Sequence, residues 1–502
     1  MEWKKVLDRQ ELTSFITELD WKYIKQNFFT FIILYGLAML SIFRANVNYI
    51  DDLGRSADGY RGWDNFSRWI SQYGSVLVHG KTHLTDMSPM PQLLAIVGIA
   101  IASTIVLYVF VDRKKYSLVN VMAVLPLGIS PYFLECLSYK YDSPYMALSV
   151  LSAIFPFLFL EHSKKWFCIA SFTGLLIMCM TYQASSGIYI LMLIFYCFKI
   201  FVRDEYCDYH KLVSIIFLGI ICFGISLGVY KLFFVKAANT YVSSELAKNG
   251  LLTTAYNNAN TYIKLILSDI PVGWRNLCVG VLSLFMVNVI VKTKRNKCLV
   301  LFITLITLGL GLVLSYGAYL VLQKPLFATR AMYGIGAFVA IISVVGLTVW
   351  NKNVIFKVVC CYLSWCLFGY AFLYGNALAE QKRYAEFRIQ MVINDLNALP
   401  MTQKSSSEKV ILTGSTLNSP LVERWSNLYP VLRRETPSLF SGSNWIWHSA
   451  YFFKYYDLKH MEKLNIGKEK ISKEELNHMP VIYNKRYHEI LSDGRYILVK
   501  LK

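Results

Sequence analysis

Long apolar runs separated by short charged connectors constrain this chain more than any other feature of its sequence. The runs are roughly 17 to 24 residues long, which is the length that a helix needs to cross about 30 Å of hydrocarbon at 1.5 Å per residue. Only 17% of the residues are charged, whereas soluble domains usually carry about a quarter. The sequence therefore predicts a polytopic α-helical membrane protein.

We expect about eleven transmembrane helices, and the connectors between them predict their orientation. The expected spans are residues 28–43, 91–111, 117–134, 143–160, 166–182, 187–201, 212–235, 272–291, 298–320, 331–350 and 355–375. The basic connectors that begin at residues 112, 162, 292 and 351 share one side if every span forms. Basic loops face the cytoplasm, so the N-terminus is expected inside and the C-terminus outside.

Four segments are expected outside the hydrocarbon. Residues 1–27 carry apolar residues at helical spacing with lysines between them, which predicts an amphipathic helix on the inner surface. The loops at 44–90 and 236–271 and the tail at 376–502 fall on the outer face. The tail predicts a small α/β domain, with a strand, a glycine turn and a helix over 409–425 and a hairpin turning at Asp493 and Gly494.

Charge and cysteine usage exclude several classes of protein. The formal net charge of +19 partly reflects lysines and arginines beside the membrane, so we do not expect nucleic acid as a partner. No zinc-ligand spacing, P-loop or dinucleotide fingerprint occurs in the sequence. The eleven cysteines lie in or beside spans or in the connector at 202–211, and we interpret them as apolar fillers.

The first outer loop places two adjacent carboxylates, Asp51 and Asp52, directly after the first span. The loop continues with an apolar stripe of helical spacing formed by Trp63, Phe66, Ile70, Tyr73 and Leu77, and the other face carries Asp64, Arg68 and Gln72. This pattern predicts one helix along the outer leaflet, with the carboxylates at headgroup depth. Without that context, the two residues would be solvated surface or a helix cap.

Most polar residues of the membrane part gather where spans meet the outer surface. They are Asp51, Asp52, Arg55, Lys140, Asp142, Gln183, Arg275, Lys324 and Arg330. The span interiors carry few ionisable residues, which argues against an ion-coupled transporter. Arginine binds phosphate oxygens bidentately, and a nearby carboxylate can take a proton from a hydroxyl. The set predicts sugar transfer from a lipid phosphate to a hydroxyl.

Four motifs resemble the serotype-converting O-antigen glucosyltransferases of the Gtr type. They are YIDDLGR at 49–55, YKYDSP at 139–144, TYQASSG at 181–187 and ATRAMYG at 328–334. The resemblance implies a membrane glycosyltransferase similar in plan to the GT-C enzymes, in the bacterial inner membrane. It implies undecaprenyl-phosphate glucose as the donor and a sugar of the lipid-linked O-antigen as the acceptor, met at the periplasmic face.

The resemblance also implies roles for individual residues. Asp51 or Asp52 would be the general base, and Asp51 is slightly preferred because it is nearer the span. Arg330 and Lys140 would hold the donor phosphate, with Arg55 and Arg275 as further candidates, and Asp142 and Gln183 would contact sugar hydroxyls. No D-x-D motif occurs in the sequence, so we expect no metal cofactor.

Several of these residues have simpler explanations. Asp142 and Ser143 precede a proline and could cap a helix, Ser185 and Ser186 could do the same, and Arg330 could be an interfacial anchor. His79 and His83 have metal-like spacing, but two histidines favour a polar loop. Trp445 and Trp447 could stack on sugar or be buried.

The functional alternatives are a lipid-linked oligosaccharide polymerase or flippase, or a non-enzymatic membrane scaffold. The scarcity of charge in the span interiors argues against a flippase, which needs a hydrophilic path across the membrane. A polymerase would act on a similar lipid at the same face.

Overall fold

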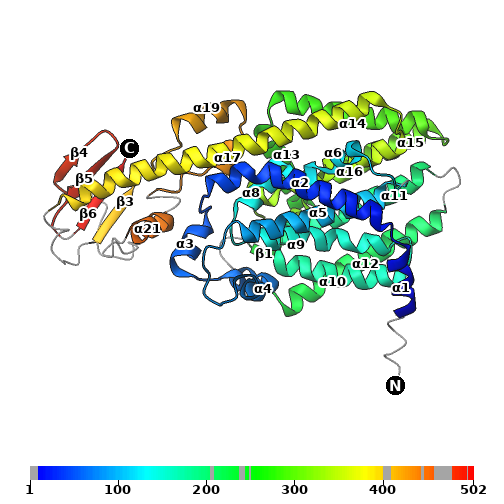
Figure 1. Cartoon of the computed structure of the whole chain (residues 1–502), viewed down its shortest axis with the longest axis horizontal. Coiled ribbons are helices and arrows are strands. Elements are labelled where there is room, and N and C mark those ends of the chain that lie inside the picture. The colour runs from blue at the N-terminus through cyan, green and yellow to red at the C-terminus, as the bar shows by residue number, and fades with distance from the viewer. Residues whose placement is uncertain are drawn as a thin grey trace, which may run out of the picture.

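Helices that run side by side along the longest axis of the molecule form most of the structure, and a small sheet lies beyond one end of them (Figure 1). The structure is a computed structural model, and it describes residues 9–112, 114–203, 208–236, 243–247, 250–399, 409–441, 446–456, 478–494 and 496–502. Helices α3 (Asp51–Asp58) and α4 (Trp69–His79) lie toward the sheet, whereas α1 (Arg9–Glu18) lies at the other end. We call these the tail end and the opposite end of the bundle.

Seven of the described helices are long and apolar enough to cross a membrane. They are α2 (Trp21–Ala45), α5 (Met90–Phe110), α11 (Ser186–Arg203), α12 (Tyr209–Phe233), α14 (Val272–Lys292), α15 (Lys297–Leu314) and α17 (Val354–Asn397). The shorter apolar helices are α9 (Ser143–Ile154) with η3 (Phe155–Phe159), and α16 (Gly334–Val349). The chain is thus a polytopic membrane protein, but the expected count of eleven spans is not confirmed.

An eighth span forms if one bent set of helices is counted as a single crossing. It consists of α6 (Leu118–Val124), α7 (Pro126–Ile129) and α8 (Pro131–Ser138), and it bends by 58° at the break. Prolines open both α7 and α8. A proline has no N–H to bond to the preceding turn, so it starts a helix and interrupts one that would otherwise continue. The break delivers α8 to the tail end of the bundle.

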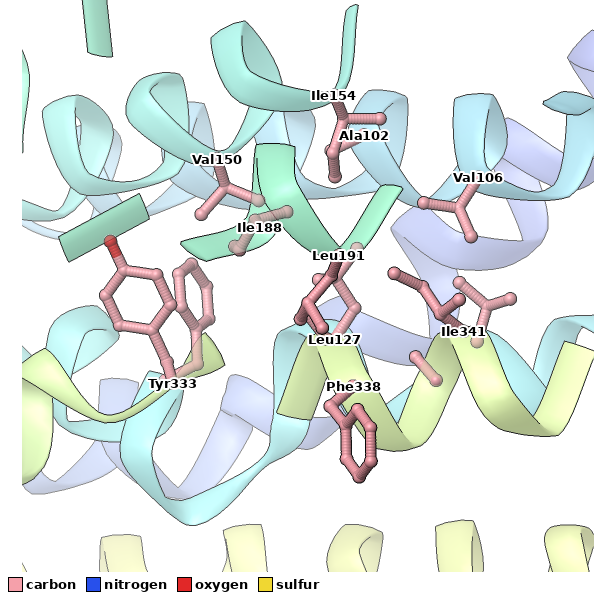
Figure 2. Packing of buried hydrophobic residues seen from close by; sticks show 14 of the residues in the cluster. Ala102, Val106, Leu127, Val150, Ile154, Ile188, Leu191, Tyr333, Phe338 and Ile341 are labelled. Atoms are coloured by element: carbon pink, nitrogen blue, oxygen red, sulfur yellow. The ribbon is translucent and has the colours of Figure 1, made fainter. Parts of the chain in front are cut away.

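The core of the bundle is packed from apolar side chains on five helices. Figure 2 shows Ala102 and Val106 of α5, Leu127 of α7, Val150 and Ile154 of α9, Ile188 and Leu191 of α11, and Phe338 and Ile341 of α16 facing one another. All of them are buried. Helix α10 (Lys164–Thr181) packs beside α12 and α9. This close-packed apolar core holds the loops of the tail end on a rigid frame.

The expected N-terminal helix is only partly described. Helix α1 ends at Glu18, and α2 begins at Trp21 after Asp20, whose side chain accepts a hydrogen bond of 2.9 Å from the Tyr23 N–H. One face of α1 packs inward, since Phe15 is buried with its ring centroid 4.8 Å from that of Phe159. The amphipathic helix and the first span are therefore two helices, and residues 1–8 lie outside the described part of the chain.

The expected single helix over residues 63–77 is wrong. A 3₁₀ turn, η2 (Trp63–Phe66), is separated from α4 by Ser67, which has a positive φ of 57°. Trp63 turns inward and is 1% exposed, whereas Leu77 on α4 is 88% exposed. The buried face of α4 is polar, with Ser71, Ser75 and His79. A polar face turned inward and an apolar face turned outward suit a helix beside lipid.

The tail forms a four-stranded sheet in the order β3-β6-β5-β4. Its elements are β3 (Lys409–Thr413), α19 (Pro420–Leu428), α20 (Leu432–Glu435), α21 (Ile446–Tyr455), β4 (Val481–Asn484), β5 (His488–Ser492) and β6 (Tyr496–Leu501). The predicted strand, turn and helix after residue 409 are confirmed, and so is the hairpin, whose Gly494 has a φ of 86°.

Helix α17 joins the tail to the bundle without a break. It runs for 44 residues, so the expected start of the tail at residue 376 falls inside a continuous helix. Its last turns supply Ile389, Val392 and Leu396 to the core of the sheet. The tail sheet is therefore carried on the end of a helix that begins as a membrane span.

The described part of the loop expected over 236–271 also meets the bundle at the tail end. Strand β1 (Ser243–Leu246) pairs antiparallel with β2 (Leu322–Lys324), and α13 (Leu251–Asp269) follows β1 in the chain. Short 3₁₀ turns, η4 (Gln183–Ser185), η5 (Gly317–Val321) and η6 (Thr329–Ala331), complete this surface.

Candidate active site

Asp51 and Asp52 begin α3, and the turn that precedes them is tightly constrained. Ile50 adopts a φ of 44° and a ψ of −100°, a conformation that a β-branched residue rarely takes. The backbone carbonyl of Ile50 accepts a hydrogen bond from the Nε2 of His448 on α21. The two carboxylates are not in an extended segment as expected, and on a helix their side chains project about 100° apart.

Asp52 is completely buried, whereas Asp51 is partly exposed. The Oδ2 atom of Asp52 accepts hydrogen bonds from the backbone N–H groups of Tyr49, at 3.1 Å, and Lys140, at 2.9 Å. Its Oδ1 has no hydrogen-bond partner in the described part of the chain. Burial raises the pKa of Asp52 to about 7, although the Lys140 N–H and the positive charges of Arg55 and Lys140 oppose this rise. The carboxyl group can therefore exchange a proton near neutral pH.

The second polar group joins α3 to the start of α9. The Arg55 guanidinium forms an ion pair with Asp142, and the indole N–H of Trp63 donates to the same carboxylate. Arg55 also lies over the Trp63 ring, 4.2 Å from the centroid. Asp142 occupies the N-cap position of α9, but its side chain makes no capping hydrogen bond. The helix begins where the capping interpretation expected, but both side-chain oxygens of Asp142 hold Arg55 and Trp63 instead of capping backbone N–H groups.

Lys140 is enclosed between α3 and the loop before α5. Its side chain is only 5% exposed, and its Nζ lies 2.7 Å from Asp86 Oδ2. The Lys140 charge holds the pKa of Asp86 below its usual range, against the opposing effect of burial. The backbone of Lys140 thus positions Asp52, and its ammonium group is already paired.

Glu135 forms the centre of a third group, which the sequence did not single out. It lies on α8 with its side chain 2% exposed, and its Oε1 is 3.2 Å from Arg330 Nη1 and 3.2 Å from the Tyr49 hydroxyl. Thr329 donates to its other oxygen. A lone carboxylate inside the apolar run over 131–138 was the only local signal, and the bend that delivers it here could not be read from spacing.

The tail contributes a further buried carboxylate, Glu435 on α20. Its Oε2 accepts a hydrogen bond of 2.6 Å from the Tyr370 hydroxyl, and its backbone carbonyl lies 2.9 Å from the Tyr49 hydroxyl. Burial raises the pKa of Glu435 well above its ordinary value. Next to it, Arg434 forms an ion pair with Asp269 at the end of α13. Helix α20 is therefore inserted among bundle helices, although it is far along the chain.

Two predicted residues lie outside these groups. The Gln183 side-chain amide donates to the Tyr230 hydroxyl at 2.8 Å, which ties η4 to α12. The Arg275 side chain makes no hydrogen bond or ion pair with the residues that the structure describes. A missed residue, Arg68, lies with its guanidinium 4.5 Å from the centroid of the Tyr182 ring. Its Nε has no partner among the described residues.

The two histidines do not form a metal site within the described residues, and the two tryptophans are not tested. His79 stacks on Tyr141 with ring centroids 5.4 Å apart, and His83 lies against Gly59. No group of three histidine, cysteine, aspartate or glutamate side chains there could hold a metal ion. Trp445 and the side chain of Trp447 lie outside the described part of the chain.

A bundle of apolar helices with buried, hydrogen-bonded carboxylates and arginines at one end defines an integral membrane protein with a polar site at that end. The family model described as glucosyl transferase GtrII matches residues 40–341, and the chain belongs to this family. The matched segment contains Asp52, Glu135 and Arg330, whereas α17 and the tail follow it. Membership implies glucosyl transfer in O-antigen modification.

One relative supports the assignment over most of the chain. A 55.3 kDa protein from the gtrB 5′ region of Salmonella phage P22 is 24% identical over 453 residues, which cover 83% of this chain and 87% of that protein. No solved structure is detectably similar to this chain.

Proposed function

We propose that the protein transfers glucose from undecaprenyl-phosphate glucose to a sugar hydroxyl of the lipid-linked O-antigen at the periplasmic face of the inner membrane, with Asp52 as the general base. The observation that carries this proposal is the environment of Asp52. One oxygen is held by two backbone N–H groups, the other is without a partner in the described chain, and the pKa is near 7. A base of this kind is efficient at neutral pH.

The reaction breaks one bond and forms one. The acceptor hydroxyl oxygen bonds to the anomeric carbon of glucose while the bond from that carbon to the phosphate oxygen breaks. The electron pair leaves with undecaprenyl phosphate, and the hydroxyl proton passes to Asp52. Arg330 suits the departing phosphate because a guanidinium binds two oxygens at once, and Glu135 holds it in place at 3.2 Å.

Asp52 is a better candidate than Asp51, which the sequence slightly favoured. Asp51 is partly exposed, so water competes for its carboxylate. The side chains of Arg55 and Lys140 are paired with carboxylates and are each only 5% exposed, whereas the Arg330 side chain is 16% exposed. We therefore assign Arg55 and Lys140 to positioning and not to the donor phosphate. Asp142 has the same positioning role, because Arg55 and Trp63 occupy its oxygens.

Reconstitution of the purified protein tests this proposal. Undecaprenyl-phosphate glucose and extracted lipid-linked O-antigen repeat are supplied in proteoliposomes, and transfer of labelled glucose to the repeat is measured. Glucose transfer to the repeat is the expected result. Joining of repeats would indicate a polymerase, movement of intact lipid across the bilayer a flippase, and the lack of any change a scaffold.

The proposed face of the membrane has its own test. The charged connectors predict that the tail is periplasmic, so a reporter fused after residue 399 should be active in the periplasm. A fusion after residue 162 serves as the control and should report the cytoplasm. Cytoplasmic activity after residue 399 would place the whole tail end, including Asp52, on the wrong side for a periplasmic acceptor.

A further inference from the structure

A pocket of about 190 Å³ lies beside Asp52, between the end of α2, helix α17 and the tail. Residues 46–49 and Leu53 form one wall, Gln381, Lys382 and Glu386 of α17 form the second, and Phe452, Tyr455 and Tyr456 form the third. Pockets for drug-sized ligands usually measure roughly 300–1,000 Å³. This one suits a single small ring.

The lining of the pocket carries no net charge. Its charged side chains are two lysines and two carboxylates, and they pair with one another: Lys140 lies 2.7 Å from Asp86, and Lys382 lies 4.0 Å from Glu386. These pairs leave no excess positive charge in the lining to attract a phosphate. The pocket is therefore suited to a neutral ligand, and the donor phosphate belongs elsewhere.

Aromatic residues and amides make up half of the uncharged residues that line the pocket. The rings of Tyr455 and Tyr456 stand edge to face with centroids 5.7 Å apart, and Tyr455 is 62% exposed. Asn48 also lines the pocket, and its Oδ1 is buried with no hydrogen-bond partner in the described part of the chain. A buried oxygen of this kind needs a donor. A ligand with an apolar ring face and donating hydroxyl groups satisfies both features.

The wall of the pocket is directly connected to the proposed base. Tyr49 and Leu53 lie on either side of Asp52 in the sequence, and both line the pocket. Lys140 contributes its side chain to the pocket and donates its backbone N–H to Asp52 Oδ2. The tail secures this wall, since His448 bonds to Ile50 and the Tyr451 ring leaves no room for a Cβ at Gly54.

We propose that this pocket binds a neutral pyranose ring of the acceptor glycan, stacked on Tyr455 and Tyr456 and hydrogen-bonded to Asn48, with the tail thereby selecting the acceptor. This inference rests on the proposed function, because it assigns the acceptor side of that reaction. It also gives the tail a direct role in the site, although the tail follows the segment that the family model matches.

The test separates acceptor binding from donor use. Tyr455→Ala and Asn48→Ala are compared with wild type in the reconstituted assay, and Tyr73→Ala serves as the matched control, because Tyr73 is 67% exposed on α4 outside the pocket. Loss of a stacking partner should raise the KM for the acceptor by roughly tenfold. The KM for undecaprenyl-phosphate glucose and the kcat at saturating acceptor should stay within about twofold of wild type.

A binding measurement keeps this test independent of activity. Saturation-transfer NMR with the O-antigen repeat oligosaccharide, cleaved from its lipid, should show contact with the wild-type and Tyr73→Ala proteins and much weaker contact with Tyr455→Ala. Undecaprenyl phosphate should not displace the oligosaccharide.

The outcomes separate two failures. Wild-type transfer with an unchanged acceptor KM in both pocket variants overturns the acceptor pocket and leaves the proposed function standing. Oligosaccharide binding that depends on Tyr455, without any glucose transfer by wild type, overturns the proposed function and supports the pocket. Displacement by undecaprenyl phosphate overturns the assignment to a neutral sugar.

Discussion

The two ends of the helix bundle both carry many charges, but they hold them in different ways. At the tail end, Asp52, Arg55, Lys140 and Asp142 are buried and are joined by short contacts across elements far apart in the sequence. At the opposite end, a wide bowl of about 940 Å³ is lined by Lys115, Arg203, Lys352 and Lys357, with Asp112 as the acid.

The difference lies in the cost of removing charge from water. Lys115, Arg203 and Lys352 are exposed, so their charges are screened, and under the positive-inside rule we expect them to act together in setting the topology. A buried carboxylate has a high free energy unless it is hydrogen-bonded, paired or protonated. We therefore expect the buried charges at the tail end to take part in the reaction. We expect the exposed charges at the opposite end to set the orientation of the protein in the membrane.

The largest effect is expected for Asp52→Asn. The amide keeps the shape of the side chain but cannot take a proton, and a general base is commonly worth roughly 10² to 10⁴ in rate. The kcat of glucose transfer should fall by that factor with little change in the KM for undecaprenyl-phosphate glucose. Asp51→Asn is the matched control and should lower kcat far less. If wild type and Asp52→Asn are present in the membrane in equal amounts and transfer glucose at similar rates, Asp52 is not the general base.

Arg330→Ala should have the next largest effect. Loss of a charged hydrogen-bond partner in a partly desolvated site costs about 1.5 to 3 kcal/mol, so kcat/KM for the donor should fall by about 10- to 100-fold. Arg275→Ala provides the comparison, because its side chain makes no contact with the three polar groups. Equal losses in both variants, or none in either, would reduce Arg330 to an interfacial anchor.

The pH dependence of the rate should reveal the buried carboxyl directly. Burial raises the pKa of Asp52 to about 7, and the base must be ionised to accept a proton. The rate should therefore rise with pH through a midpoint near 7, by about tenfold between pH 6 and pH 8. The residual activity of Asp52→Asn should lack this rise. A wild-type profile that is flat over the same range would mean that another group takes the proton.

The smallest effect is expected at the opposite end of the bundle. Lys352→Ala and Lys115→Ala each remove one exposed charge from the bowl, and single exposed charges contribute little to stability. Transfer rates should stay within about twofold of wild type in proteoliposomes, whichever way round the protein is inserted. A fall in transfer rate as large as that of Arg330→Ala would show that the exposed charges of the opposite end also take part in the reaction.

Site residues that belong to short sequence motifs could be recognised from the sequence, whereas residues that meet only in the folded chain could not. Asp52, Arg55, Lys140, Asp142 and Arg330 were recognised in short motifs, and the structure brings them to one end of the bundle. Gln183 comes from a similar motif and Arg275 was named for its place near the end of a span, but both lie outside these groups. Glu135 and Glu435 were missed because their partners are distant in sequence. A bend in the α6–α8 helix set brings Glu135 to its partners, and the return of the tail to the bundle brings Glu435 to its own.

Apolar periodicity and length determine by themselves that this chain enters a membrane, since hydrocarbon accepts only helices that satisfy their own backbone hydrogen bonds. Turn residues likewise determined the tail hairpin at Gly494. Only the tertiary structure decided which carboxylate is buried, because Asp51 and Asp52 are the same residue type in the same turn. The N–H groups of Tyr49 and Lys140 and the packing of the tail around α3 bury Asp52 and leave its neighbour partly in water.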